Sequence, residues 1–122
     1  VEAAVAREQK EIERREQLYR GDRPAADVRG KAVLLVDDGL ATGSTMVAAA
    51  RCVGGLEPEQ VIVAVPVASR EACARMREEA DLCVCLFTPQ PFDAVGRWYL
   101  DFRQVSDAEV RALLAEGRQS RA

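Results

Sequence analysis

One segment, VLLVDDGLATGST from Val33 to Thr45, constrains the fold of this chain more than any other. It begins with apolar residues, continues with two acids, and then enters a loop that holds two glycines and three hydroxyl side chains. A continuous apolar run is typical of a strand that is buried on both faces of a parallel sheet. Ligands of such sheets bind beyond the carboxyl ends of the strands, where these acids and this loop lie.

Strands and helices alternate along the chain, which predicts a parallel sheet with right-handed crossovers. We expect strands over 31–37, 61–67 and 82–87, and helices over 1–20, 44–53, 70–80 and 106–117, the last ended by Gly117. The segment 31–87 is then a βαβαβ core, and 88–105 is a long aromatic loop. The predicted fold class is α/β, a three-layer α/β/α arrangement of which this chain carries about three strands and an N-terminal helix.

The first expected helix has only a narrow apolar stripe, in which Val5, Ile12 and Tyr19 recur at heptad spacing. Such a stripe fits either light packing on a neighbouring element or pairing with another chain. Because few strands are expected and the chain starts within a helix, we expect 1–122 to be the C-terminal part of one domain. A missing N-terminal half or a homo-oligomer would then cover the exposed sheet edge.

Composition argues against several classes of protein. The net charge of −3 predicts no general affinity for nucleic acid or for an anionic membrane. The sequence has no apolar stretch long enough to span a bilayer and no signal peptide, so we expect a cytoplasmic protein. The chain has four cysteines and no histidine, and no CxxC pair. We therefore expect the cysteines to be small buried apolar side chains in a reducing compartment rather than a zinc site.

The glycines and hydroxyls of the central loop predict a phosphate site. Gly39 and Gly43 let the backbone come close to a ligand. The helix that follows presents free N–H groups to the loop, and these favour an anion. The hydroxyls of Thr42, Ser44 and Thr45 add further hydrogen-bond donors, so the loop suits a phosphate monoester.

The two acids before the loop predict a sugar next to the phosphate. Asp37 and Asp38 would repel a phosphate that touched them. They are suited to accept hydrogen bonds from neutral hydroxyl groups instead. Phosphate donors on one side and sugar acceptors on the other predict a slot for ribose 5-phosphate.

Other motifs with similar parts match less well. A VLLVDD run also occurs in the first strand of response-regulator receivers, but the ATGST loop that follows argues against that class. A Walker P-loop needs GxxxxGK[ST] and a dinucleotide fingerprint needs GxGxxG, and neither pattern is present. The simplest structural alternative is that DDG forms a turn and that Thr42 or Ser44 caps a helix.

The register of acids, glycines and hydroxyls resembles the 5-phosphoribosyl 1-pyrophosphate motif of the type I phosphoribosyltransferases. More narrowly, the chain resembles a bacterial group of predicted phosphoribosyltransferases of unestablished substrate, through REQKEIERREQLYR before the motif and PFDAVGRWYLDFRQVSD after it. The resemblance implies a phosphoribosyltransferase-like fold. It also implies a reaction in which a nitrogen nucleophile, on a base or a related compound, displaces magnesium pyrophosphate at the anomeric carbon.

The resemblance also implies roles for residues. Asp37 and Asp38 would bind the ribose 2′- and 3′-hydroxyls, and one of them would help to stabilise positive charge on the sugar. The 5′-phosphate would be held by a set of loop residues that follows the turn at Gly39, namely Ala41, Thr42, Gly43, Ser44 and Thr45. Mg²⁺ is the implied cofactor.

All aromatic residues except Tyr19 lie between Phe87 and Phe102. In the 6-oxopurine phosphoribosyltransferases this region has an aromatic residue, a Val-Gly and an Asp followed by an aromatic, an order that Phe92, Val95-Gly96 and Asp101-Phe102 resemble with different spacing. The resemblance implies that Trp98 or Phe92 stacks on a base and that Asp101 helps to hold magnesium. The alternative is that these aromatics only pack the loop onto the core.

Two further loops of the family, one for pyrophosphate and one that closes over the site, precede the motif and have no counterpart in 1–30. We therefore expect the isolated chain to be inactive and the protein that contains it to be a phosphoribosyltransferase. The alternatives are a non-catalytic regulator that binds phosphoribosyl pyrophosphate or a nucleotide, and a fragment with only a structural role.

Overall fold

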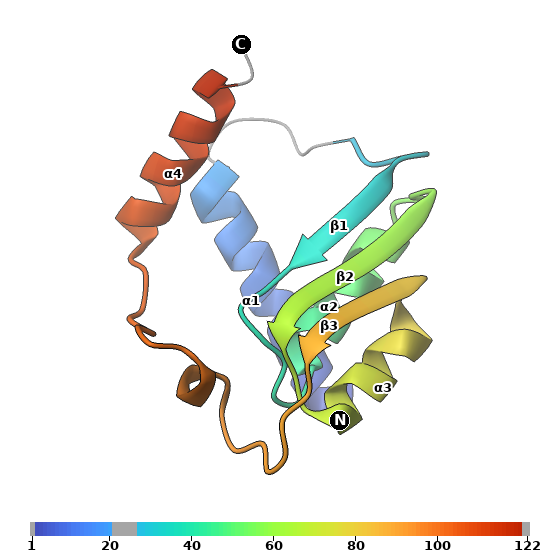
Figure 1. Ribbon diagram of the computed structural model, residues 1–122. Helices are drawn as coiled ribbons and strands as arrows, with labels where there is room; N and C mark the ends of the chain where they lie inside the picture. Colours follow the sequence, from blue (N-terminus) through green and yellow to red (C-terminus); the bar gives the residue numbers. More distant parts are fainter. Residues whose placement is uncertain (1, 21–26, 121–122) are drawn as a thin grey trace.

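A computed structural model describes residues 2–20 and 27–120 of the chain. Its elements, in chain order, are α1 (Glu2–Arg20), β1 (Ala32–Val36), α2 (Ser44–Gly54), β2 (Gln60–Val67), α3 (Arg70–Glu79), β3 (Leu82–Phe87), the 3-10 turn η1 (Val95–Trp98) and α4 (Asp107–Ser120) (Figure 1). The strands form one parallel sheet in the order β1-β2-β3, with Leu35 opposite Val63 and Val63 opposite Cys83. The predicted α/β class with a parallel sheet is confirmed.

The hydrophobic core lies between one face of this sheet and the helices α1, α2 and α3. Alternate residues of β2 point into it, and Val63 in the middle of the strand is completely buried. Met46 of α2 and Met76 of α3 belong to the same buried cluster. Helix α1 packs on α2 through Val5, which is 2% exposed. The narrow apolar stripe of α1 therefore packs against other elements of the same chain.

The opposite face of the sheet is exposed and apolar. We call it the bare face and define it by Leu34, Val36, Val84 and Leu86, of which Val36 is 67% and Leu86 79% exposed. A shallow apolar hollow runs over it beside Pro66 of β2. Within 2–20 and 27–120, no helix covers the bare face, and Figure 1 shows α1 and α2 behind the sheet. The described part therefore has one helical side of the expected three-layer arrangement.

Helix α4 differs from the expectation at its end. Gly117 was predicted to end this helix, but α4 continues to Ser120, because Gly117 does not adopt the left-handed conformation by which a glycine ends a helix. The helix is tied to α1 by Arg111, whose guanidinium donates to the carbonyl oxygen of Leu18 at 2.9 and 3.1 Å. Residues 21–26 of the expected loop before β1 lie outside the described residues. In the described part, every helix is too short or too polar to cross a membrane.

The cysteines also differ from the expectation. Cys73 of α3 and Cys85 of β3 form a disulfide, while Cys52 and Cys83 are free. The expectation of four unpaired cysteines is wrong because α3 packs directly on β3 and brings the two Cα atoms within 6.9 Å. Cys73 is buried and Cys85 half-buried, so the expectation that these side chains belong to the apolar interior is correct in position.

Candidate functional site

The loop between β1 and α2 encloses a pocket of about 190 Å³ at the carboxyl end of the sheet. Of the predicted site residues, Asp38, Trp98 and Asp101 do not line it and the others do. The lining residues are Asp37, Gly39, Leu40, Ala41, Thr42, Gly43, Ser44, Thr45, Met46 and Val95. The segment that was singled out in the sequence therefore folds into a single concave site.

The N-terminus of α2 opens into this pocket. Gly43 has φ 83° and ψ 0°, a left-handed conformation that an L side chain rarely adopts, and it turns the chain into the helix. The first intrahelical bond is donated by Val47 N to Gly43 O at 2.8 Å. The N–H groups of Thr45 and Met46 precede that bond and have no acceptor within the helix. The N-cap residue Gly43 offers no side chain to these two groups, so they are available to an anion.

Close backbone contacts hold the first half of the loop against the end of β2. A Cβ atom added at Gly39 would lie 2.6 Å from Val95 Cγ1 and 2.9 Å from Val67 O, so only glycine fits without displacement. Next to it, Leu40 N donates to Val67 O at 3.0 Å and Leu40 O accepts from Ser69 N at 3.0 Å. Leu40 thus extends the sheet by one parallel bridge to Ala68, and this bridge fixes the position of the loop relative to the end of β2.

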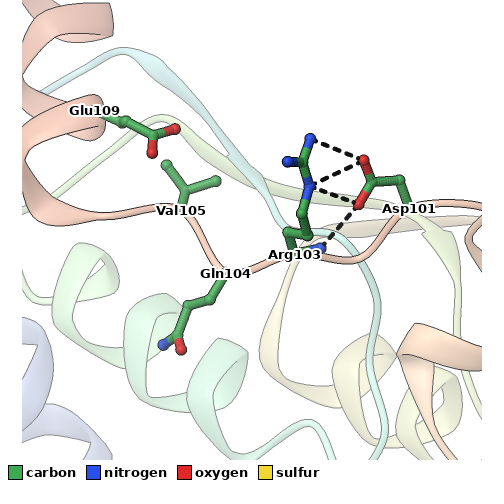
Figure 2. Close-up of a pocket in the computed structure, with 5 residues that line it drawn as sticks. All are labelled: Asp101, Arg103, Gln104, Val105 and Glu109. Carbon is green, nitrogen blue, oxygen red and sulfur yellow. Dashed lines mark hydrogen bonds and ion pairs between the residues drawn. The ribbon is translucent and has the colours of Figure 1, made fainter.

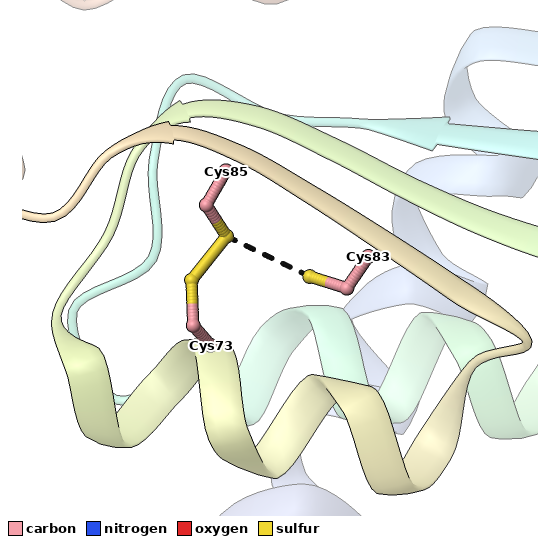
Figure 3. Close-up of side chains that lie close together, drawn as sticks. All are labelled: Cys73, Cys83 and Cys85. Atoms are coloured by element: carbon pink, nitrogen blue, oxygen red, sulfur yellow. Dashed lines mark hydrogen bonds between the residues drawn. A yellow bond between two sulfur atoms is a disulfide. The ribbon is translucent and has the colours of Figure 1, made fainter.

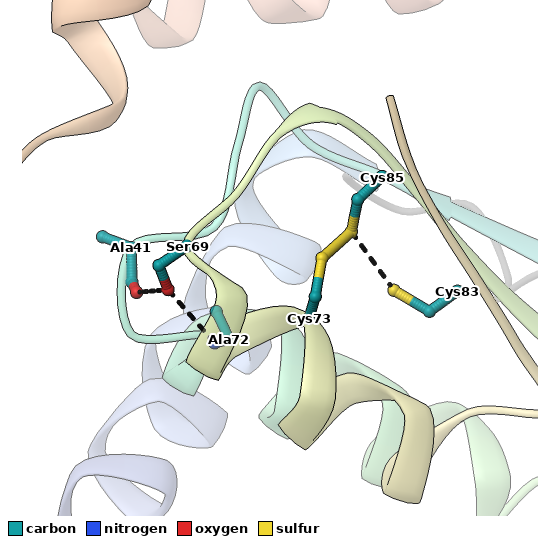
Figure 4. Close-up of a disulfide and its surroundings, with 6 residues drawn as sticks. All are labelled: Ala41, Ser69, Ala72, Cys73, Cys83 and Cys85. Atoms are coloured by element: carbon teal, nitrogen blue, oxygen red, sulfur yellow. Dashed lines mark hydrogen bonds between the residues drawn. A yellow bond between two sulfur atoms is a disulfide. The ribbon is translucent and has the colours of Figure 1, made fainter. Parts of the chain in front are cut away.

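The N-terminus of helix α3 supports the second half of the loop. Figure 4 shows Ala41 of the loop beside Ser69 at the start of this helix. Ser69 is the N-cap of α3: its hydroxyl oxygen accepts from Ala72 N at 3.1 Å, and the hydroxyl also donates to Ala41 O at 2.8 Å. One turn further on, Arg75 donates to Thr42 O at 3.3 Å. Arg75 supports the loop, and the sequence did not single it out. It lies three residues after Ala72 and so on the same face of the helix as that residue.

Hydroxyls within the loop are arranged around Ser44. The Thr42 hydroxyl donates to Ser44 Oγ at 3.3 Å and accepts from Ser44 N at the same distance. Arg75 approaches Ser44 Oγ at 3.5 Å. The hydroxyl of Thr45 donates to a carboxylate oxygen of Glu8 on α1 at 3.0 Å. Glu8 was not singled out in the sequence, because nothing in a helical segment so far from the motif indicates this contact.

The paired acids follow β1 directly, where the loop begins, and only Asp37 lines the pocket. Asp37 borders the pocket and its Oδ1 accepts from Asp38 N at 2.8 Å. Partial loss of solvent, followed by the negative charge of Asp37, raises the pKa of Asp38. The Tyr99 hydroxyl donates to the carbonyl oxygen of Asp38, and desolvation together with these two carboxylates raises the pKa of the phenol. Tyr99 is a neighbour of the site that the sequence did not single out.

The remaining predicted site residues lie elsewhere. Trp98 packs edge-on against Phe87, with ring centroids 5.6 Å apart at 87°, and it does not border the loop pocket. Asp101 binds the guanidinium of Arg103, with its Oδ2 3.1 Å from Nη2, in a separate pocket of about 300 Å³ that Figure 2 shows. The structure therefore brings 37–45 together and leaves Trp98 and Asp101 apart; their roles in binding a base and magnesium stay predictions.

Comparison with known proteins agrees with this architecture. The family model of the phosphoribosyl transferase domain matches residues 2–95. Two Mycobacterium tuberculosis proteins, MT0597 of strain CDC 1551 / Oshkosh and Rv0571c of strain ATCC 25618 / H37Rv, are each named provisionally as phosphoribosyl transferases. Each is 41% identical over 112 residues, which is 91% of this chain and 25% of the relative.

A solved structure is also similar. The crystal structure of TT1426 from Thermus thermophilus matches with a TM-score of 0.80 and 48% identity, over 91% of this chain and 53% of that chain. The chain thus spans about a quarter of the curated relatives and about half of the solved one. Because the family model covers more than half of its residues, the chain belongs to the phosphoribosyl transferase domain family.

Proposed function

We propose that the loop pocket binds the ribose 5-phosphate end of 5-phosphoribosyl 1-pyrophosphate. The protein that contains this chain then transfers the phosphoribosyl group to a nitrogenous base or a related nucleophile and releases pyrophosphate. One observation carries the proposal: a single pocket is lined both by the N-terminus of α2 and by Asp37, and Asp38 is the next residue in the chain. A phosphate needs hydrogen-bond donors and the hydroxyls of a sugar need acceptors, and the segment around this pocket offers both.

The 5′-phosphate is held by the start of α2. Backbone N–H groups at Thr45 and Met46 and the hydroxyls of Thr42 and Ser44 donate to its oxygens. The helix dipole adds roughly 0.3–1 kcal/mol to this grip. Arg75 lies behind the loop and bonds Thr42 O, so it holds the donors in place and adds positive charge.

The acids act on the sugar. Asp37 and Asp38 accept hydrogen bonds from the 2′- and 3′-hydroxyls and fix the ring relative to the anchored phosphate. In a transition state with positive charge on the ring, the carboxylate that lies closer to the anomeric carbon stabilises that charge. The raised pKa of Asp38 indicates that the protein alone does not satisfy this carboxylate fully, and a hydroxyl donor would lower that pKa again.

Magnesium belongs to the proposal as the partner of the pyrophosphate. When bound, Mg²⁺ neutralises negative charge on the leaving pyrophosphate, and it prefers carboxylate oxygens together with substrate phosphate oxygens. Asp37 and Asp38 form no ion pair with any cation of the described part, so their oxygens fit such a role. Asp101 fits it only after its carboxylate leaves Arg103.

Isothermal titration calorimetry of this chain with ribose 5-phosphate, and with phosphoribosyl pyrophosphate plus Mg²⁺, tests the site. We expect both ligands to bind with similar, weak affinity, because the pocket holds only their common end. Asp38→Asn should weaken binding of both by roughly 10–100-fold, the usual range for a hydrogen bond to a charged group. Asp27→Asn, the same change before β1, is the matched control and should leave binding unchanged. Failure of the folded chain to bind either ligand would contradict the proposal.

Turnover separates an enzyme from a regulator that only binds the ligand. In a longer protein that contains this chain, Asp38→Asn should abolish release of pyrophosphate while part of the ligand binding stays. The longer protein is assayed with phosphoribosyl pyrophosphate and each of the common nucleobases. Binding of phosphoribosyl pyrophosphate without release of pyrophosphate would favour the non-catalytic regulator. The isolated chain should show no turnover.

A further inference from the structure

Helix α3 and strand β3 bring three sulfur atoms together beneath the sheet (Figure 3), and none of the three cysteines lines the loop pocket. Cys73 comes from α3, while Cys83 and Cys85 lie two residues apart on β3 and so share the face that the helix covers. All three sulfurs lie within 4.8 Å of one another, and the Cys83 and Cys85 sulfurs are 3.6 Å apart. The proposed ribose 5-phosphate site uses none of these residues.

We propose that, once the Cys73–Cys85 disulfide is reduced, the three thiolates of this cluster bind one soft metal cation, Cu(I). Thiolates are soft ligands and select soft cations such as Cu(I) over magnesium or calcium. A cation at the centre of three thiolates, at a metal–sulfur distance of about 2.3 Å, separates the sulfurs by about 4 Å. The Cys83 and Cys85 sulfurs, 3.6 Å apart, are already close to that separation, and reduction of the disulfide frees the Cys73 sulfur to move away from Cys85.

The absence of a fourth ligand favours Cu(I) over zinc. Structural zinc sites are almost always four-coordinate. The chain has no histidine, and among the described residues the group that could share an ion consists of these three cysteines only. Cys73 is 2% exposed, which leaves little room for water as a further ligand. Cu(I) is stable with three sulfur ligands and needs no other.

One cation neighbours the thiolates of this cluster. The guanidinium of Arg77 lies close enough to Cys83 to interact with its charge. One Cu(I) ion replaces three thiol protons, so the three thiolates and the ion together keep a net negative charge. The ion offsets one of the three negative charges, and the guanidinium of Arg77 opposes part of the rest.

The disulfide must be reduced before the metal binds, and the electrons and protons of both steps balance. A dithiol such as dithiothreitol gives two electrons and two protons to Cys73 and Cys85, and it closes to its own disulfide. Binding of Cu(I) to the three thiols then releases their protons to solvent. In the oxidised chain the two sulfurs of the disulfide are not thiolates, so that form should not bind the ion.

The test is a competition for Cu(I) between the reduced chain and the chelator bicinchoninate, without oxygen and after removal of the dithiol. We expect each reduced chain to keep one Cu(I) ion from the chelator. Cys83→Ser should weaken binding at least about 100-fold, since loss of a direct ligand exceeds the 10–100-fold effect of losing an outer-shell partner. Cys52→Ser is the matched control, because Cys52 lies on α2 outside the cluster, and it should bind like the unchanged chain. The oxidised chain should retain no Cu(I).

Circular dichroism establishes that each variant is folded, and X-ray absorption of the copper complex counts its ligands without any substitution. Three sulfurs at about 2.2–2.3 Å are expected. The proposal is overturned if the reduced chain yields all its copper to bicinchoninate, if Cys83→Ser binds as tightly as the unchanged chain, or if Cys52→Ser loses the ion as well.

Discussion

Gly39 offers the sharpest test of how the loop is built. Its φ is outside the left-handed region, so replacement by alanine tests space alone. The new methyl group would meet Val95 Cγ1 at 2.6 Å and the backbone oxygen of Val67 at 2.9 Å. The Val95 side chain can rotate, but the Val67 oxygen also accepts from Leu40 N and cannot move without stretching that bond. We expect Gly39→Ala to lower the free energy of unfolding by about 1–3 kcal/mol, the usual cost of overpacking.

Urea unfolding followed by circular dichroism measures this loss. With a slope of about 1–3 kcal/mol per molar urea, a loss of about 2 kcal/mol moves the midpoint down by roughly 1 M. Gly54→Ala is the matched control, because nothing lies within 4 Å of its added Cβ at the end of α2, and its midpoint should stay or rise. The reasoning is refuted if Gly39→Ala unfolds at the midpoint of the unchanged chain, or if Gly54→Ala falls as far.

Three further variants test the support of the site. Ser69→Ala should cost about 1–3 kcal/mol in urea unfolding, because the N-cap and the bond to Ala41 O are both lost; an unchanged midpoint would contradict this. Arg75→Met should weaken ribose 5-phosphate binding about 2- to 10-fold in calorimetry, since it removes the bond that holds the loop; unchanged affinity would refute that role. Because the pKa of Asp38 is raised above its ordinary 3.8, the stability that this group contributes is present below pH 3.8 and lost as the pH rises through the folded value. Asp38→Asn should therefore be more stable than the unchanged chain at neutral pH, and this gain in stability should vanish below pH 3.8. A gain that persists in acid would exclude the charge of Asp38 as its cause.

The elements of the chain and the loop of the site were predictable from local sequence. The expected strands 31–37, 61–67 and 82–87 differ from β1, β2 and β3 by one residue at most, because uninterrupted apolar runs between turn residues leave few alternatives. The loop was identified because phosphate and sugar binding demand particular residue types in a fixed order.

Contacts between distant elements were not predictable in the same way. The pairing of Cys73 with Cys85 depends on which turn of α3 faces β3, and the bond from Tyr99 to Asp38 depends on the path of an irregular loop. Arg75 looked like one charge among several on α3 because a single sequence does not show which face of that helix meets the loop. Each of these errors concerns the packing of elements rather than their identity.

The bare face makes the sheet a surface that can be redesigned. Leu34, Val36, Val84 and Leu86 point away from the core and from the loop pocket, so their side chains are free of both. Threonine at these positions would keep the strand preference of a β-branched residue while removing apolar surface from water. Such a chain would adsorb less to plastic, resin and other proteins during purification, and its ligand binding could be measured at higher concentration without interference from self-association.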